Sequence, residues 1–190
     1  MIASSLRLVV GLGNPGLAYK RSRHNAGFMI LERLAARHGL RFNQRRAHSK
    51  LARGTLGAHD LVLAMPQTYV NLSGQAVQGV VMSCGVRPSH ILVVYDDLDL
   101  PLGTLRIRPY GGPGTHNGMR SIVEYLGTTK FPRLRFGIGT LDARAHPDFV
   151  LSDFGPDEAV LFDETRERAV RAIEVLLSDG IEAAMNEFNG

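Results

Sequence analysis

Cysteine and tryptophan are almost missing from this 190-residue chain, which has one cysteine, Cys84, and no tryptophan. A single cysteine cannot form a disulfide within the chain, and it has no cysteine partner for a zinc site. The sequence also lacks any run close to the roughly 20 apolar residues of a membrane-spanning helix. Its first residues do not show the basic segment and long apolar core of a secretory signal. We therefore expect a soluble, cytoplasmic protein without a membrane contact.

Linkers and low-complexity segments are absent too. Glycine and proline are spread along the chain, no serine-rich or glycine-rich stretch divides it, and 44% of the residues are hydrophobic. Such a composition is typical of a globular protein. The length suits one substantial hydrophobic core. We expect a single domain over residues 1–190.

A strong charge of either sign is also missing, since the formal net charge is only +4. Most of the cations are arginines, whose planar guanidinium groups match the geometry of phosphate. A small positive excess fits a nucleic-acid partner, but it is also common among proteins that have none. The positions of the arginines must decide between these interpretations.

Two kinds of apolar pattern alternate along the chain. Strand-like runs occur at residues 6–10, 61–65, 91–95, 105–108 and 134–138. Helix-like spacing occurs at residues 26–38, 73–84 and 116–125, in a long stretch that begins at Pro156, and in a short one that ends near Phe188. Residues 43–57 are polar and cationic and predict neither element. The alternation predicts an α/β fold: one twisted, mixed, mostly parallel sheet flanked by helices on both faces.

Three polar side chains follow strands of this predicted sheet. Asn14 comes after the first strand, Asn71 follows the strand at 61–65, and Asp96 ends the strand at 91–95. In α/β folds, ligands bind beyond the carboxyl ends of the parallel strands. We therefore expect these three side chains to converge at one edge of the sheet.

His24 precedes the first predicted helix and is the side chain best suited to proton transfer near neutral pH. No serine or cysteine lies in the motif of an activated nucleophile. This combination indicates a histidine that deprotonates water while a carboxylate, Asp96, fixes its tautomer. Carboxamides can hold a polar carbonyl group, and Asn14, Asn71 and Asn117 are the candidates.

Two other sites fit parts of the sequence. The segment GLGNPG at 11–16 has the letters of a dinucleotide-binding loop, but about eight residues separate it from the next helix, and no acidic residue follows a second strand at the usual distance. Asp96, Asp97 and Asp99 with His116 could hold a divalent metal, although neighbouring carboxylates on a strand point to different sides. We favour neither site.

Arginines alternate on two of the predicted strands, Arg106 with Arg108 and Arg133 with Arg135. Each pair would share one face of its strand and could bind phosphate groups. The same spacing also fits solvent-facing positions of two edge strands. The pattern leaves both interpretations open.

Five ordered motifs together resemble the bacterial-type peptidyl-tRNA hydrolase family, over nearly the whole chain. They are LVVGLGNPGLAYKRSRHNAG at 8–27, QTYVNLSGQAV at 67–77, ILVVYDDLDLPLG at 91–103, GGPGTHNGMRSI at 111–122 and RLRFGIG at 133–139. The resemblance implies a monomeric α/β enzyme that cleaves the ester between a peptide and the 3′ ribose of a tRNA. It implies no metal and no cofactor.

The resemblance also implies roles for single residues. His24 matches the family's general base for water, and Asp96 matches the carboxylate that orients it. Asn14 falls at the position that steadies the reacting ester and water. Together these three residues are the expected catalytic set.

Substrate contacts are implied at further positions. Asn71 and Asn117 match the residues that hold the peptide main chain, and we also expect Tyr19 and Tyr69 to bind substrate. Arg108 and Arg135 align with cationic positions that clamp the 5′ phosphate of the tRNA. The expected partner is thus the acceptor stem and 3′ end of a peptidyl-tRNA.

Three positions depart from the family pattern. Thr115 replaces a glycine, Val70 a methionine and Ser22 a threonine. None of them removes a proposed catalytic group, so they bear on substrate fit. The alternative function is a relative of the same fold that binds RNA without catalysis, and the intact set of His24, Asp96 and asparagines argues against it.

Overall fold

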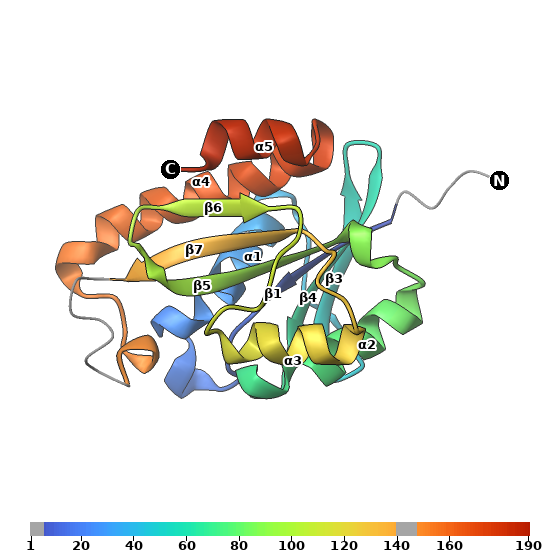
Figure 1. Ribbon diagram of the computed structural model, residues 1–190, viewed down its shortest axis with the longest axis horizontal. Helices are drawn as coiled ribbons and strands as arrows, with labels where there is room; N and C mark the ends of the chain where they lie inside the picture. Colours follow the sequence, from blue (N-terminus) through green and yellow to red (C-terminus); the bar gives the residue numbers. More distant parts are fainter. Residues whose placement is uncertain (1–5, 140–147) are drawn as a thin grey trace.

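Seven strands form one sheet in a computed structural model that describes residues 6–139 and 148–190 (Figure 1). The strands are β1 (Arg7–Gly11), β2 (Gln44–Arg46), β3 (Ser49–Leu56), β4 (His59–Pro66), β5 (Ile91–Pro101), β6 (Leu105–Arg108) and β7 (Arg133–Gly139). Their order across the sheet is β2-β3-β4-β1-β5-β7-β6. The parallel neighbours β1 and β4, β1 and β5, and β5 and β7 are not consecutive in the chain, as crossover connections require.

Parallel pairing is confined to the centre of the sheet. Strand β1 pairs in parallel with β4 and β5, and β5 pairs in parallel with β7. Strands β2, β3 and β6 are joined to the sheet by antiparallel pairs. The predicted α/β class with a mixed sheet is confirmed, and its antiparallel strands lie at the two edges.

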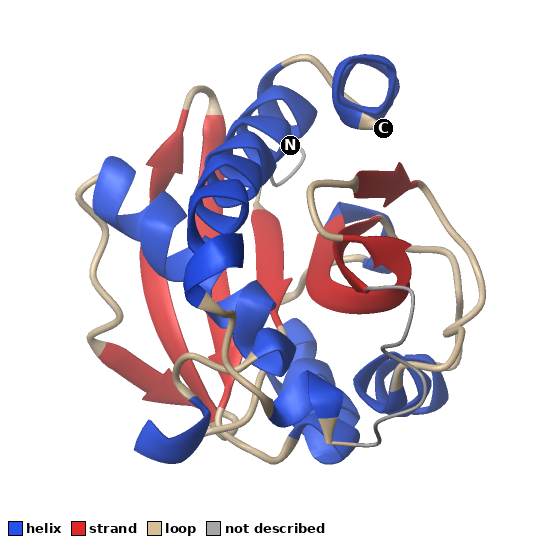
Figure 2. Cartoon of the chain, turned by 90° about the vertical axis from the view of Figure 1, so that its left-hand side faces the viewer, coloured by secondary structure: helices blue, strands red, loops and turns tan. Residues whose placement is uncertain are grey.

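Helices cover both faces of the sheet, as the sequence predicts (Figure 2). The helices are α1 (Ala26–Arg37), α2 (Ser73–Cys84), α3 (Asn117–Leu126), α4 (Ala159–Ser178) and α5 (Ile181–Phe188). Side chains of α1, α4 and α5 fill one core with one face of the strands, and side chains of α2 and α3 fill a second core with the other face. Among the helices that the structure describes, none has the length and hydropathy to cross a membrane.

The polar segment 43–57 was expected to form no element, and this expectation is wrong. It forms β2 and β3 near the edge of the sheet, where β2 pairs with β3 and β3 pairs with β4. Leu51 and Ala52 point to opposite faces of β3 and are buried in the two cores, whereas Arg53 and Thr55, farther along the strand, are exposed. Strand β2 and the later part of β3, which β2 does not pair with, are largely exposed and tolerate cations, so the apolar signal of the segment is weak.

The strand predicted at 91–95 does not end at Asp96. Strand β5 continues to Pro101, with a register shift against β7 between Asp97 and Pro101. However, β1 ends at Gly11, which pairs with Val94. Asp96 therefore lies beyond the end of the neighbouring strand β1. It is at the carboxyl edge of the sheet as expected, although β5 is longer than predicted.

A close contact between glycines fixes the start of α1 against the sheet. A Cβ atom added to Gly27 would lie 2.4 Å from the carbonyl oxygen of Val94 and 2.5 Å from the amide nitrogen of Leu12. One added to Gly11 would lie 2.5 Å from the carbonyl oxygen of Gly27. The first turn of α1 therefore lies directly on the backbones of β1 and β5, which brings His24, just before α1, close to Asp96.

Gly27→Ala is expected to lower the free energy of unfolding by about 2 kcal/mol or more, because the methyl group would overlap backbone atoms that cannot rotate away. Urea denaturation of wild type and variant measures the difference. Gly112→Ala is the control, since its added methyl group meets no atom within 4 Å. Equal stability of Gly27→Ala and wild type would contradict the close contact.

Candidate active site

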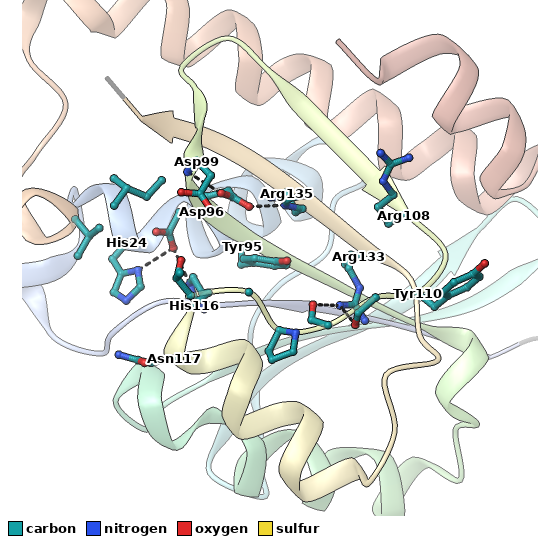
Figure 3. Close-up of a pocket in the computed structure, with 18 residues that line it drawn as sticks. His24, Tyr95, Asp96, Asp99, Arg108, Tyr110, His116, Asn117, Arg133 and Arg135 are labelled. Carbon is teal, nitrogen blue, oxygen red and sulfur yellow. Dashed lines mark hydrogen bonds and ion pairs between the residues drawn. The ribbon is translucent and has the colours of Figure 1, made fainter. Parts of the chain in front are cut away.

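A cavity of about 480 Å³ opens at the carboxyl edge of the parallel strands (Figure 3). Its walls come from β5, β6, β7 and the loop at 109–116, and His24 and Val150 close one side. Of the nine residues proposed for the site, five line this cavity: His24, Asp96, Arg108, Asn117 and Arg135. These five residues come from five separate segments that the fold brings together.

Two histidines share one carboxylate oxygen at the floor of the cavity. The Nδ1 atom of His24 lies 2.8 Å from Oδ1 of Asp96, and the Nε2 atom of His116 lies 3.1 Å from the same oxygen. The Asp96 side chain is only 2% exposed. A carboxylate buried this deeply is stable only with such partners.

The hydrogen-bond network assigns the ring protons. The backbone N–H of Met119 donates to Nδ1 of His116 at 3.3 Å, so the proton of neutral His116 is on Nε2, where it is donated to Asp96. His24 donates its Nδ1 proton to the same oxygen. The Nε2 atom of neutral His24 therefore keeps its lone pair, and this atom can accept a proton.

The pair shifts both pKa values. Burial alone would raise the pKa of Asp96, but the charges and hydrogen bonds of His24 and His116 outweigh burial and hold that pKa below its ordinary value. Burial alone would lower the pKa of His24, but the charge and hydrogen bond of Asp96 outweigh it and raise the pKa of His24 above 6.5. His24 is thus a stronger base than an ordinary histidine.

These shifts act on stability in opposite pH directions. The folded-state pKa of Asp96 is lowered, so its stabilising contribution is present above the unfolded-state value and is lost as pH falls through the folded-state value. The folded-state pKa of His24 is raised, so its contribution is complete at low pH and is lost as pH rises through that value. Both contributions to stability are complete only at pH values between the unfolded-state pKa of Asp96 and that of His24.

Asn14 does not line the cavity, but it is fixed beside His24. The carboxamide of Asn25, the residue after His24, accepts from the backbone N–H of Asn14 and donates to its carbonyl oxygen, both at 2.9 Å. The Oδ1 atom of Asn14 accepts from the backbone N–H of Val70 at 2.9 Å. This leaves Nδ2 of Asn14 as the donor without a partner in the described part of the chain. Asn25 was not singled out from the sequence.

The other proposed substrate residues lie around this centre. Asn117 begins α3 at the cavity wall. Tyr69 and Asn71 flank Val70 and are exposed, and Tyr19 is partly buried at the end of a short turn, Leu17–Tyr19. These last three do not line the cavity.

Four arginines share one face of β6 and β7. Arg106 pairs with Arg135, and Arg108 pairs with Arg133, in the antiparallel register. Strand β7 is not an edge strand, because it lies between β5 and β6. Arg135 donates through Nε to Asp97, whereas Arg108 is exposed at the cavity rim.

Arg133 differs from the other three arginines because its guanidinium group binds backbone carbonyl oxygens. It is buried, and its Nη1 atom donates to the carbonyl oxygens of Gly111 and Gly112 at 2.5 and 2.9 Å, while Nη2 donates to that of Thr129 at 3.0 Å. The guanidinium group thus fixes the glycine-rich loop that forms one cavity wall. Sequence spacing could not separate this residue from the exposed arginines.

The two alternative sites are not supported. Residues 11–16 lead into two short 3-10 turns before α1 begins, so the glycines do not open directly into a helix as a dinucleotide loop does. Asp97 is engaged by Arg135 and by the backbone N–H of Asp99, not turned toward Asp96. The groups that do lie together are His24, Asp96 and His116, whose ligand atoms are within 4.8 Å of one another.

His24 is also held through its other neighbour, Arg23. The Arg23 guanidinium forms two hydrogen bonds with the Glu158 carboxylate, at 2.8 and 2.6 Å, and lies over the rings of Phe149 and Phe154. Its Nε atom donates to Oγ of Ser152 at 3.2 Å. The segment that contributes Val150 to the cavity is thus fastened to the residue before His24.

Comparisons with known proteins give one family. Residues 8–190 match the family model described as peptidyl-tRNA hydrolase. A Chloroflexus aggregans protein named peptidyl-tRNA hydrolase is 52% identical over 187 residues, which cover 96% of this chain and 98% of that protein. The crystal structure of peptidyl-tRNA hydrolase from Acinetobacter baumannii is similar with a TM-score of 0.90 at 36% identity, and the match covers 98% of this chain and 97% of that one.

Asp96→Asn is expected to move the pKa of His24 from above 6.5 to below it. Asparagine can still accept the His24 proton, but the negative charge that raises the pKa is gone and burial remains. NMR titration of the histidine rings measures the change. His90, whose pKa is lowered by burial and nearby cations, is the internal control and should titrate alike in both proteins. An unchanged His24 titration would contradict the assigned charge pair.

Proposed function

This chain belongs to the peptidyl-tRNA hydrolase family, and we propose that it hydrolyses the ester between the peptide and the 3′ ribose of peptidyl-tRNA. The observation that carries the proposal is the 2.8 Å contact of His24 Nδ1 with the buried Asp96, which leaves Nε2 free to accept a proton. We assign residues 1–190 to one catalytic domain, supported by the family match over 8–190. The product tRNA is free for reuse in translation.

His24 acts first as a base and then as an acid. Its Nε2 atom takes a proton from water while the hydroxide attacks the ester carbonyl carbon. Asp96 stabilises the imidazolium ion that forms, which agrees with the raised pKa of His24. Collapse of the tetrahedral intermediate breaks the bond to the ribose oxygen, which receives the proton from His24. One water and one ester thus give a 3′ hydroxyl group and a peptide carboxylic acid, which then loses its proton to solvent.

Amide groups steady the reacting carbonyl. We assign this role to Asn14, since its Oδ1 is used by Val70 and its Nδ2 is left to donate to a developing oxyanion. Asn117 at the cavity wall is assigned to the peptide main chain. We assign Asn71 to the peptide main chain as well, and Tyr69 and Tyr19 to substrate binding, although these three residues do not line the cavity.

The cationic side of the cavity is assigned to the tRNA. Arg108 and Arg135 line the same cavity as His24, on one face of the sheet. A 5′ phosphate bound there and an ester bound at His24 would select the end of an acceptor stem over other esters. We further propose a monomer, as the resemblance to the family implies, and a cytoplasmic location, where translation provides the substrate.

A non-catalytic RNA-binding relative is the alternative. Such a protein needs the basic face but has no use for a buried carboxylate that raises the pKa of a histidine. The His24 and Asp96 pair therefore favours hydrolysis.

His24→Asn is expected to lower the rate of peptide release from an N-blocked aminoacyl-tRNA by about 10²- to 10⁴-fold, because the proton acceptor is lost. For wild type, kcat/KM should rise with pH through a midpoint above 6.5, where His24 becomes neutral. An unblocked aminoacyl-tRNA serves as the control substrate and should remain intact. A variant as active as wild type would refute the proposed base.

Arg108→Ala is expected to raise the KM for peptidyl-tRNA about tenfold with little change in kcat, since one charge-assisted contact to phosphate is removed. Arg106→Ala is the matched control, because Arg106 is on the same strand but does not line the cavity. With a substrate whose 5′ phosphate has been removed, Arg108→Ala and wild type should have equal KM values. A difference that persists without the phosphate would contradict the clamp.

A further inference from the structure

Tyr110 lies where the active-site cavity meets a second cavity. It lines the first cavity together with Arg108, and it lines a second one of about 450 Å³ together with Lys130, Thr129 and Pro132. In Figure 3, Tyr110 and His24 lie at opposite ends of the row of labelled side chains. The side chain of Tyr110 therefore borders the path by which a long substrate would leave the catalytic end.

The ring of Tyr110 is exposed, but the backbone next to it is fixed. The residue is 67% exposed. The backbone N–H of Gly111 donates to the carbonyl oxygen of Thr129 at 3.3 Å, and Arg133 donates to the carbonyl oxygen of Gly111 at 2.5 Å. Pro109 restricts the backbone on the other side. An aromatic ring held in this way loses little entropy when a flat group packs on it.

The charges around Tyr110 suit an RNA strand. Arg108 on one side is exposed, and Lys130 on the other side lines the second cavity. No acidic residue is among the described residues that line the second cavity. A flat aromatic face between two cations matches a nucleotide, whose base stacks while its phosphates meet the positive charges.

We propose that Tyr110 is a stacking platform for a base at the end of the tRNA, and that it contributes to recognition of the RNA rather than of the peptide. This inference rests on the proposed function, because it places the ester at His24 and a phosphate at Arg108. The base is either one of the single-stranded 3′ end or one face of the terminal base pair. Both present the same aromatic surface to the ring.

The test compares Tyr110→Ala with Tyr110→Phe on three N-acetyl-aminoacyl esters: of adenosine, of a short single-stranded RNA end, and of full tRNA. For Tyr110→Ala, KM for full tRNA should rise about tenfold at nearly unchanged kcat, since stacking on one base is lost. Tyr110→Phe keeps the ring and should stay within about twofold of wild type. Tyr125→Ala is the matched control, because Tyr125 is exposed but lines neither cavity.

The pattern across substrates identifies the base. A rise in KM for both RNA substrates assigns the single-stranded end, and a rise for full tRNA alone assigns the terminal base pair. An equal loss with the adenosine ester would mean damage to the catalytic end and would overturn the proposal. So would unchanged KM values on all three substrates.

Binding of uncharged tRNA, measured by fluorescence anisotropy, separates this proposal from the proposed function. Tyr110→Ala should bind about tenfold more weakly than Tyr110→Phe, whether or not the protein hydrolyses any ester. Equal binding by these two variants would overturn the stacking role. Wild type that bound tRNA but cleaved none of the three esters would refute hydrolysis alone.

Discussion

The single oxygen of Asp96 that meets both His24 and His116 is the contact on which the site depends. It joins the turn before α1, the extension of β5 and the start of α3, three segments with no sequence continuity. Without the two rings, a carboxylate this deeply buried would lose its charge. Without the carboxylate, the His24 ring would have no fixed tautomer. The rings therefore keep Asp96 charged, and Asp96 keeps His24 in the tautomer that can accept a proton at Nε2.

Part of this arrangement could be predicted from the sequence, because the place of ligand sites beyond the carboxyl ends of parallel strands depends only on the path of the backbone. Asp96 was expected at the carboxyl edge of the sheet, and it lies there even though β5 is longer than predicted, since β1 stops opposite Val94. Helices on both faces followed from the alternation of patterns. These expectations concern the path of the backbone, which local patterns of apolar residues determine.

Other features depend on contacts between distant side chains and had no local signal. His116 was considered only as a metal ligand, and its bond to Asp96 spans 20 residues. Arg133 and Arg135 are two residues apart on β7 and share one face. Arg133 nevertheless binds the glycine-rich loop, whereas Arg135 binds Asp97. The β2 and β3 hairpin was missed because β2 and the later part of β3 are largely exposed and carry few apolar residues. Only the three-dimensional partners distinguish these cases.

The bond between Arg23 and Glu158 has a consequence for how the protein is made. Its two residues are 135 positions apart, so the neighbour of His24 cannot be fixed until most of the chain has left the ribosome. Domains fold as units while synthesis proceeds from the first residue to the last. A nascent chain that ends before Glu158 thus carries His24 but lacks the ion pair of its neighbour Arg23. The catalytic centre is completed late in synthesis, although its proposed base is among the first residues to be translated.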